Sequence, residues 1–138
     1  MTTFIDTSVL IDVAAEESQH HAWSVDRLND ARTRGPVIVS DIVYCEFAVT
    51  IPEQDAVDET LGRLDLERCG YTDAALYRAA RAFRAYRENG GPRENLLPDF
   101  LVGALADTEG VAVLTRDSRR IRTYFPNVEV IEPDTQLQ

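Results

Sequence analysis

The stretch Thr3-Phe4-Ile5-Asp6-Thr7-Ser8-Val9-Leu10-Ile11 sets the pattern for the whole chain. Residues 2–5 are typical of a short buried strand, and Thr7 or Ser8 is a suitable cap for a helix that runs through residue 14. Asp6 lies at the junction, directly after the apolar residues. An ionised carboxylate near a core is costly unless it is paired or binds a metal. The junction therefore carries information about both fold and chemistry.

Short apolar strands and helices follow one another along the rest of the chain. The order β-α-α-β-α-α-β-α-α-β-α-β is typical of an α/β sandwich with a central, mostly parallel sheet of about four to five strands. We expect one domain over residues 1–132 and a loose tail over 133–138. The remaining expected elements are strands over 37–39, 64–69, 111–114 and 128–131, and helices over 20–33, 41–50, 52–61, 72–88, 98–110 and 118–124.

Length and composition limit the class of protein. A chain of 138 residues with 44% hydrophobic residues can bury one proper core and is ordinary for a soluble globular protein. No apolar run approaches the length that spans a bilayer, and the N-terminus lacks the basic segment of a secretory signal. We expect a cytoplasmic protein with no membrane contact, in which Cys45 and Cys69 are buried free thiols.

The charge balance is acidic, with a formal net charge of −10 at pH 7. Because phosphate contacts depend mainly on basic residues, this balance argues against broad affinity for nucleic acid. All 14 basic residues are arginine, however, and arginine binds phosphate with two parallel hydrogen bonds. Several of the arginines cluster in two groups, each of which could be a local phosphate-binding surface or an ordinary solvated helix face. The groups are Arg78, Arg81, Arg84, Arg87 and Arg93, and Arg116, Arg119, Arg120 and Arg122.

Four carboxylates interrupt or border apolar segments, namely Asp6, Glu46, Asp99 and Asp117. In open α/β sheets, ligands bind beyond the carboxyl ends of the strands. Asp6 and Asp117 each follow a predicted strand, and the topology allows Glu46 and Asp99 to reach the same edge from helices. The chain has no lysine to neutralise these groups, and carboxylate oxygens suit Mg²⁺ or Mn²⁺ better than zinc. The pattern predicts metal-dependent hydrolysis of phosphodiester bonds.

Each of these carboxylates also has an ordinary structural explanation. Asp6 could cap the following helix, Asp99 could complement the positive end of a helix, and Asp117 could begin a turn. Glu46 has no such role, because it lies in the middle of a predicted helix with apolar residues on both sides. Taken together, the four positions favour a functional site.

The motifs resemble those of PIN-domain ribonucleases. Residues 4–11 look like their first motif, and the helix that carries Glu46 after Val37-Ile38-Val39-Ser40 looks like their second. Residues 98–106 and Leu114-Thr115-Arg116-Asp117 are similar to the third and fourth. The match extends over nearly the whole chain, and the order and separation of all four motifs make it specific. At this size the chain most resembles the VapC toxins of toxin–antitoxin pairs.

The resemblance implies that the four carboxylates form the catalytic, metal-binding set. Asp6 and Asp99 would be the principal ligands of Mg²⁺ or Mn²⁺. Asp117 would bind a second metal or support the first through water, and Glu46 would orient the attacking water or a metal-bound one. Two hydroxyl groups would fix these carboxylates in place, those of Thr7 and Thr115.

The resemblance also implies partners. Family members are homodimers that cleave structured RNA such as tRNA or ribosomal RNA, and as toxins they inhibit translation until a small antitoxin protein blocks the site. Arg116 is a candidate contact for RNA phosphate, although a surface salt bridge explains it equally well. We expect a surface or capping role for Asp12, which lies near the first motif. Gly103-Ala104 replaces the usual Ala-Ala of the third motif, which alters helix packing rather than chemistry.

Other classes of protein fit less well. A receiver-type phosphoacceptor domain and a Gly-Lys-Ser/Thr phosphate loop both need a lysine, and the chain has none. A haloacid-dehalogenase-like phosphatase needs two aspartates separated by one residue, whereas Asp6 is followed by Thr7-Ser8. Two alternatives stay open: an RNA-processing PIN nuclease outside a toxin–antitoxin pair, and a non-catalytic PIN-fold module that binds RNA or protein.

Overall fold

The sheet lies at the centre of the molecule and is parallel throughout. The computed structural model describes residues 1–92 and 96–133, and its five strands follow the spatial order β3-β2-β1-β4-β5. The register places Thr3 of the central strand between Val37 and Ala112. The predicted α/β architecture is therefore confirmed, whereas residues 134–138 of the predicted tail lie outside the described residues. The strands are β1 (Thr3–Ile5), β2 (Val37–Ser40), β3 (Glu67–Cys69), β4 (Ala112–Leu114) and β5 (Val130–Ile131).

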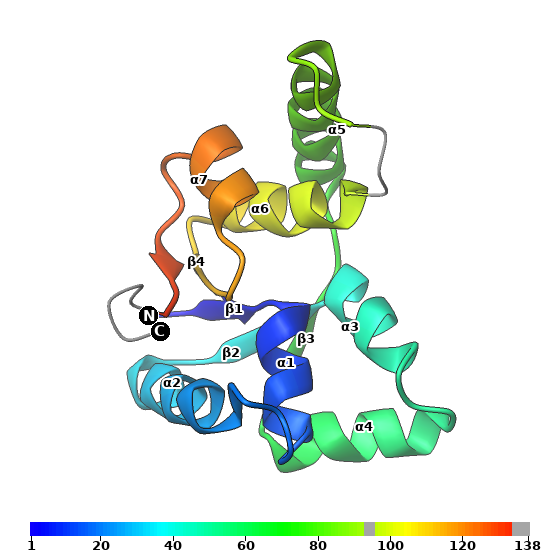
Figure 1. The fold of residues 1–138 in the computed structure, drawn as a ribbon, viewed down its shortest axis with the longest axis vertical. Helices are drawn as coiled ribbons and strands as arrows, with labels where there is room; N and C mark the ends of the chain where they lie inside the picture. The colour runs from blue at the N-terminus through cyan, green and yellow to red at the C-terminus, as the bar shows by residue number, and fades with distance from the viewer. Residues whose placement is uncertain (93–95, 134–138) are drawn as a thin grey trace.

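Helices cover both faces of this sheet, which gives three layers (Figure 1). In that view α1, α2 and α4 lie below strands β1 and β2, and α5, α6 and α7 lie above them. The order of strands and helices is the one predicted from the sequence. The helices are α1 (Thr7–Ala14), α2 (His21–Arg34), α3 (Asp41–Ala48), α4 (Gln54–Arg63), α5 (Asp73–Glu88), α6 (Leu97–Glu109) and α7 (Arg119–Tyr124).

Local capping explains where several helices begin. The Ser40 hydroxyl accepts a hydrogen bond from the backbone of Val43, and the Thr72 hydroxyl accepts one from Ala75, so each satisfies a free N–H of a first turn. Both helices begin where the sequence predicts, to within one residue. Helix α1 differs, because the Asp6 side chain caps it in place of either hydroxyl predicted for this role.

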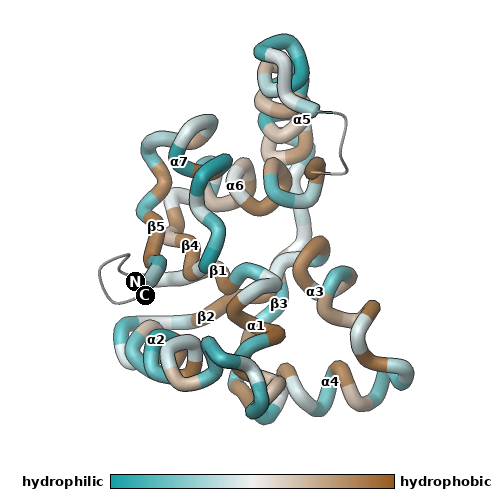
Figure 2. Tube along the Cα trace, in the orientation of Figure 1, coloured by the Kyte–Doolittle hydropathy of each residue, from teal (hydrophilic) through white to brown (hydrophobic). Residues whose placement is uncertain are grey.

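The core lies between the sheet and its helices. Every residue of β1 and β4 is buried, and Figure 2 shows hydrophobic residues along β1, β4 and β5 in the middle of the chain trace. On one face, Phe100 and Phe125 are fully buried and pack edge to face. Gly103 of α6 lies directly against the Phe125 ring, where an added Cβ would come within 2.5 Å of a ring carbon. Gly103, where the third motif usually has alanine, therefore leaves room for the Phe125 ring.

Two surface features complete the fold. Cys45 is exposed on α3, which corrects the expectation of a buried thiol, while Cys69 is partly buried; both are free. In the part of the chain that the structure describes, no helix is both long enough and apolar enough to cross a bilayer.

Candidate active site

Asp6 occupies the carboxyl end of the central strand, and both oxygens of its side chain are held. The chain leaves β1 with the Asp6 N–H bonded to the carbonyl of Leu114 on β4, at 2.9 Å. Asp6 Oδ1 accepts a hydrogen bond from the Thr7 backbone at 2.8 Å, and Oδ2 accepts one from the Thr115 hydroxyl at 2.6 Å. A carboxylate fixed at both oxygens presents its remaining lone pairs in one defined direction.

Glu46 reaches the same edge from α3, which packs against α1. The hydroxyl of Thr7 donates a hydrogen bond to Glu46 Oε1 at 2.8 Å. Thr7 therefore contacts two of the four predicted carboxylates, one through its backbone and one through its side chain. The hydrogen bond from Thr7 therefore fixes the side chain of Glu46, which lies in the middle of an apolar helix.

Asp117 joins the group through Thr115, which is fully buried at the end of β4. The Asp117 N–H donates to the Thr115 hydroxyl oxygen at 3.0 Å, while that hydroxyl donates to Asp6. One threonine therefore links the loop after β4 to the end of β1. The Asp117 side chain itself is 54% exposed, so it faces solvent at the mouth of the site.

Asp99 enters from the first turn of α6, and an arginine separates it from Asp117. Arg120 Nη1 lies 3.4 Å from Asp99 Oδ2 and 3.7 Å from Asp117 Oδ2. The Arg120 Nε is buried and has no hydrogen-bond acceptor among the described residues. These long contacts and the unmatched donor show a guanidinium that balances charge without forming a closed, bidentate pair.

The electrostatics show that the four carboxylates act on one another. Burial raises the pKa of Asp6, and the charges of Glu46 and Asp117 add to the rise against the hydrogen bonds from Thr115 and Thr7. Burial also raises the pKa of Asp99 to about 6, with the charge of Asp6 as the next cause and Arg120 opposing it. When neighbouring negative charges raise the pKa of a carboxyl group, a nearby positive charge stabilises its ionised form.

The donors fit a hard divalent cation. Within residues 1–92 and 96–133, no three aspartate, glutamate, histidine or cysteine side chains form a cage that could hold a metal ion. The four carboxylates are close enough to repel one another without forming such a cage. Mg²⁺ suits this arrangement, because it keeps several of its waters and takes only one or two carboxylates directly. The all-oxygen donors exclude a zinc site of the usual nitrogen and sulfur type.

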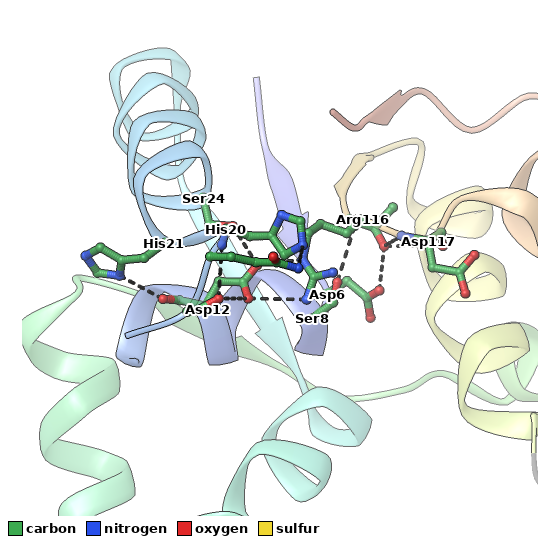
Figure 3. Close-up of polar contacts among 11 residues, drawn as sticks. Asp6, Ser8, Asp12, His20, His21, Ser24, Arg116 and Asp117 are labelled. Atoms are coloured by element: carbon green, nitrogen blue, oxygen red, sulfur yellow. Dashed lines mark hydrogen bonds and ion pairs between the residues drawn. The ribbon is translucent and has the colours of Figure 1, made fainter. Parts of the chain in front are cut away.

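The expectation for Asp12 was wrong. Its side chain is only 3% exposed and pairs with Arg116, whose Nε lies 2.6 Å from Asp12 Oδ2. Figure 3 shows the Arg116 side chain running from the Asp117 end of the site back to Asp12 on α1. Arg116, for which the sequence left open a contact with RNA phosphate or a surface salt bridge, is thus held in an ion pair by an internal carboxylate. No local signal identified this pair, because its two members are far apart in sequence.

The whole second arginine group is engaged with carboxylates. Arg119 contacts Asp117 at 3.8 Å, and Arg122 pairs with Glu132 at 2.6 Å. Within this group, Arg119 and Arg120 are the members that contact carboxylates of the candidate site. Arg120 is the member that sequence reasoning missed as a site residue, since nothing in its spacing separates it from its neighbours.

Comparisons with known proteins agree with this fold. The model of the PIN domain family matches residues 3–126. No curated protein sequence matches the chain. Among solved structures, VapBC2 from Rickettsia felis, crystallised with a DNA fragment from its promoter, has a TM-score of 0.74 at 15% identity. That match covers 97% of this chain and 100% of the other.

Two further structures share the fold at similar identity. A toxin–antitoxin complex from Klebsiella pneumoniae has a TM-score of 0.64 at 19% identity and covers 96% of this chain and 98% of its own. VapC20 from Mycobacterium tuberculosis, a toxin that cleaves the sarcin-ricin loop, has a TM-score of 0.64 at 18% identity, with 88% and 94% covered. The fold is thus that of VapC-type toxins. Since the family model covers most of the sequence, the chain belongs to the PIN domain family.

Proposed function

We propose that this chain is a Mg²⁺- or Mn²⁺-dependent endoribonuclease that acts as the toxin of a type II toxin–antitoxin pair and inhibits translation. The observation that carries the proposal is the pair Asp6 and Asp99, whose pKa values are raised at the carboxyl edge of a PIN-domain sheet. Two carboxylates whose charged forms are destabilised by burial and by neighbouring negative charges need a positive ligand to be stable when ionised. Carboxyl groups with pKa values shifted in this way are typical of functional sites.

Asp6 and Asp99 are the ligands that we assign to the cation, with Asp117 as a further ligand, direct or through water. When bound there, Mg²⁺ would lower the pKa of a water molecule and stabilise charge on the phosphodiester. Thr7 and Thr115 hold the carboxylates by hydrogen bonds of 2.8 and 2.6 Å, as the partners of metal ligands commonly do.

Hydrolysis adds water across a phosphorus–oxygen bond, so the site needs a group that takes a proton from the attacking water. Glu46 suits this role, because Thr7 holds one of its oxygens and leaves the other free to accept a proton. Arg120 lies between Asp99 and Asp117. We assign its loosely held guanidinium to the phosphate of the substrate.

The proposed substrate is tRNA or ribosomal RNA, and the proposed partner is a cognate antitoxin. The solved relatives support this choice, since one is a toxin that cleaves the sarcin-ricin loop and another is a toxin–antitoxin complex. We also propose a cytoplasmic homodimer. Leu76 and Tyr77 are exposed apolar side chains on α5 and offer a surface for a second copy.

The test is cleavage of total tRNA and ribosomal RNA by the purified protein with Mg²⁺ or Mn²⁺. Wild type is compared with Asp99→Asn, and with Asp26→Asn as a control at an exposed position on α2. We expect discrete fragments from wild type and the control, and no fragments from Asp99→Asn or after addition of EDTA. The fragment ends would identify the target.

Two outcomes would contradict the proposal. Equal cleavage by Asp99→Asn and wild type would show that the site is wrongly assigned. Binding of RNA without cleavage in either metal would favour the non-catalytic module. An antitoxin reading frame beside the gene would distinguish a toxin from an RNA-processing nuclease.

A further inference from the structure

Asp12 is a buried charge that the proposed chemistry does not use. It lies on α1, the helix that Asp6 caps, and its side chain is 3% exposed. Burial works against its ionisation, yet hydrogen bonds from Arg116, Ser24 and Ser18 bring its pKa below the ordinary value. An ionised carboxylate is stable in such a place only when donors surround it.

The donors come from two parts of the chain, the loop after β4 and the segment around Ser18 and Ser24. Arg116 meets both oxygens of Asp12, with Nε at 2.6 Å from Oδ2 and Nη2 at 3.2 Å from Oδ1. Ser24 on α2 donates to Oδ2 at 2.8 Å, and Ser18 donates to Oδ1 at 2.9 Å. The imidazole of His21 contacts the Asp12 carbonyl at 2.8 Å. Figure 3 shows Ser24, His21 and Arg116 around Asp12, between α1 and α2.

Arg116 stands between the two residues of the loop that enter the active site. Thr115 binds Asp6, and Asp117 is one of the four carboxylates. The Arg116 backbone N–H also donates to Ser8 of α1 at 3.3 Å. Side chain and backbone of this one arginine therefore fasten the loop 115–117 to α1.

The Asp117 side chain does little to hold that loop itself. It is 54% exposed, and its contacts with Arg119 and Arg120 are 3.8 and 3.7 Å long. The two-point ion pair of Arg116 with a buried carboxylate is shorter and better shielded from water. The position of Asp117 relative to Asp6 thus depends on a contact outside the site as well as on the Thr115 hydroxyl.

We propose that Asp12 and Arg116 form a positioning pair that holds the loop 115–117 and thereby sets the affinity of the acidic site for a divalent cation. The part that concerns the cation rests on the function proposed above. The part that concerns the loop stands on the contacts alone.

Positioning and simple electrostatics predict opposite results when Arg116 is removed. Loss of one positive charge near four carboxylates would by itself strengthen cation binding. Loss of the loop's anchor would weaken binding, by about tenfold or more, as for other groups that hold metal ligands in place. Arg119, which is 84% exposed and contacts the same Asp117, provides the matched control, since its removal changes charge without removing the anchor.

The experiment is calorimetric titration of the full chain with Mn²⁺. Arg116→Met alone leaves Asp12 buried without its cation, which is strongly destabilising, so the double variant Asp12→Asn/Arg116→Met is measured as well. We expect about tenfold weaker Mn²⁺ binding in the double variant and no weakening in Arg119→Met. Arg116→Lys keeps the positive charge but loses the two-point contact with Asp12. Its affinity for Mn²⁺ should lie between those of wild type and Arg116→Met. A folded double variant that binds Mn²⁺ as tightly as wild type would overturn the proposal.

Amide hydrogen exchange in the metal-free protein tests the loop directly. The Asp117 N–H, bonded to Thr115, should exchange faster in the double variant, while the N–H of Val113 in β4 should keep its protection. Unchanged exchange at Asp117 would refute the positioning role. If wild type fails to bind Mn²⁺, the proposed function fails, and the exchange result still decides whether the pair positions the loop.

Discussion

Replacing Asp99 with asparagine should stabilise the metal-free protein while it abolishes cleavage. Asp99 faces Asp6, Glu46 and Asp117, and only Arg120 opposes their repulsion. Asparagine keeps the size of the side chain and removes its charge. The variant therefore isolates the cost of keeping this carboxylate ionised among three others.

The magnitude follows from the pKa of Asp99, which is raised from 3.8 to about 6. Each pKa unit corresponds to about 1.4 kcal/mol, so ionisation above the higher value would cost about 3 kcal/mol without solvent screening. The side chain is 42% exposed, and screening reduces this cost to about 1.5 kcal/mol. Loss of a negative charge at the start of α6 removes about 0.5 kcal/mol of favourable interaction with the helix. The net expected gain is about 1 kcal/mol, or about 4 °C in Tm.

The sign depends on pH. Because the pKa of Asp99 is higher in the folded protein than in the unfolded chain, the folded protein binds more protons between these two values, and its stability falls as the pH rises through them. Asp99→Asn should thus match wild type at about pH 4 and exceed it at about pH 7.5. Urea unfolding in EDTA, followed by fluorescence of the single tryptophan, measures the difference at both pH values.

Two results would refute this reasoning. One is equal stability of Asp99→Asn and wild type at about pH 7.5, and the other is a difference that stays the same at about pH 4. Saturating Mg²⁺ provides a further check. It should stabilise wild type by about 2.7 kcal/mol at a hundred times its Kd, so that wild type becomes the more stable protein.

Further predictions concern one hydroxyl and two glycines. Thr115→Val removes the hydrogen bond to Asp6 and should slow cleavage by about 10- to 100-fold and lower the free energy of unfolding by about 1–2 kcal/mol; an unchanged cleavage rate would argue against its role. Gly103→Ala would place a Cβ 2.5 Å from the Phe125 ring and should destabilise the protein by about 1–3 kcal/mol, measured by urea unfolding. Gly62→Ala, with nothing within 4 Å of the added Cβ, should instead stabilise it by about 0.5–1 kcal/mol, and a loss there would show that α4 is more crowded than the structure describes.

The order of elements could be predicted because each signal is local. Apolar runs mark the strands, and caps such as Ser40 and Thr72 sit immediately before their helices. The prediction of a buried Cys45 shows where local sequence signals are insufficient. Val43 and Phe47 lie one helical turn apart and are both buried, so the residue midway between them faces outward. The apolar run suggested burial, whereas the helical period determines the exposed face.

The site could be predicted only in part, for a physical reason. Asp6 and Asp117 follow strands, and parallel strands bring their carboxyl ends to one edge of a sheet. Asp12 and Arg116 are not brought together by the ends of parallel strands. Their contact depends on how α1 packs against the loop after β4. A buried carboxylate can be recognised as such only when its donors are known, and two of these come from the segment around Ser18 and Ser24.

For Asp6, the role of helix cap and the proposed role of catalytic ligand are compatible. Its Oδ1 caps α1 through the Thr7 N–H, and its Oδ2 is held by Thr115 from another strand. The N-terminus of α1 carries a partial positive charge, which favours an ionised carboxylate at that point. A strand of a parallel sheet that runs directly into a helix therefore places its cap at the edge where ligands bind, and the capping bonds supply part of the stabilisation that the site needs to keep Asp6 charged. The structural role of this residue is accordingly a condition of its proposed catalytic role.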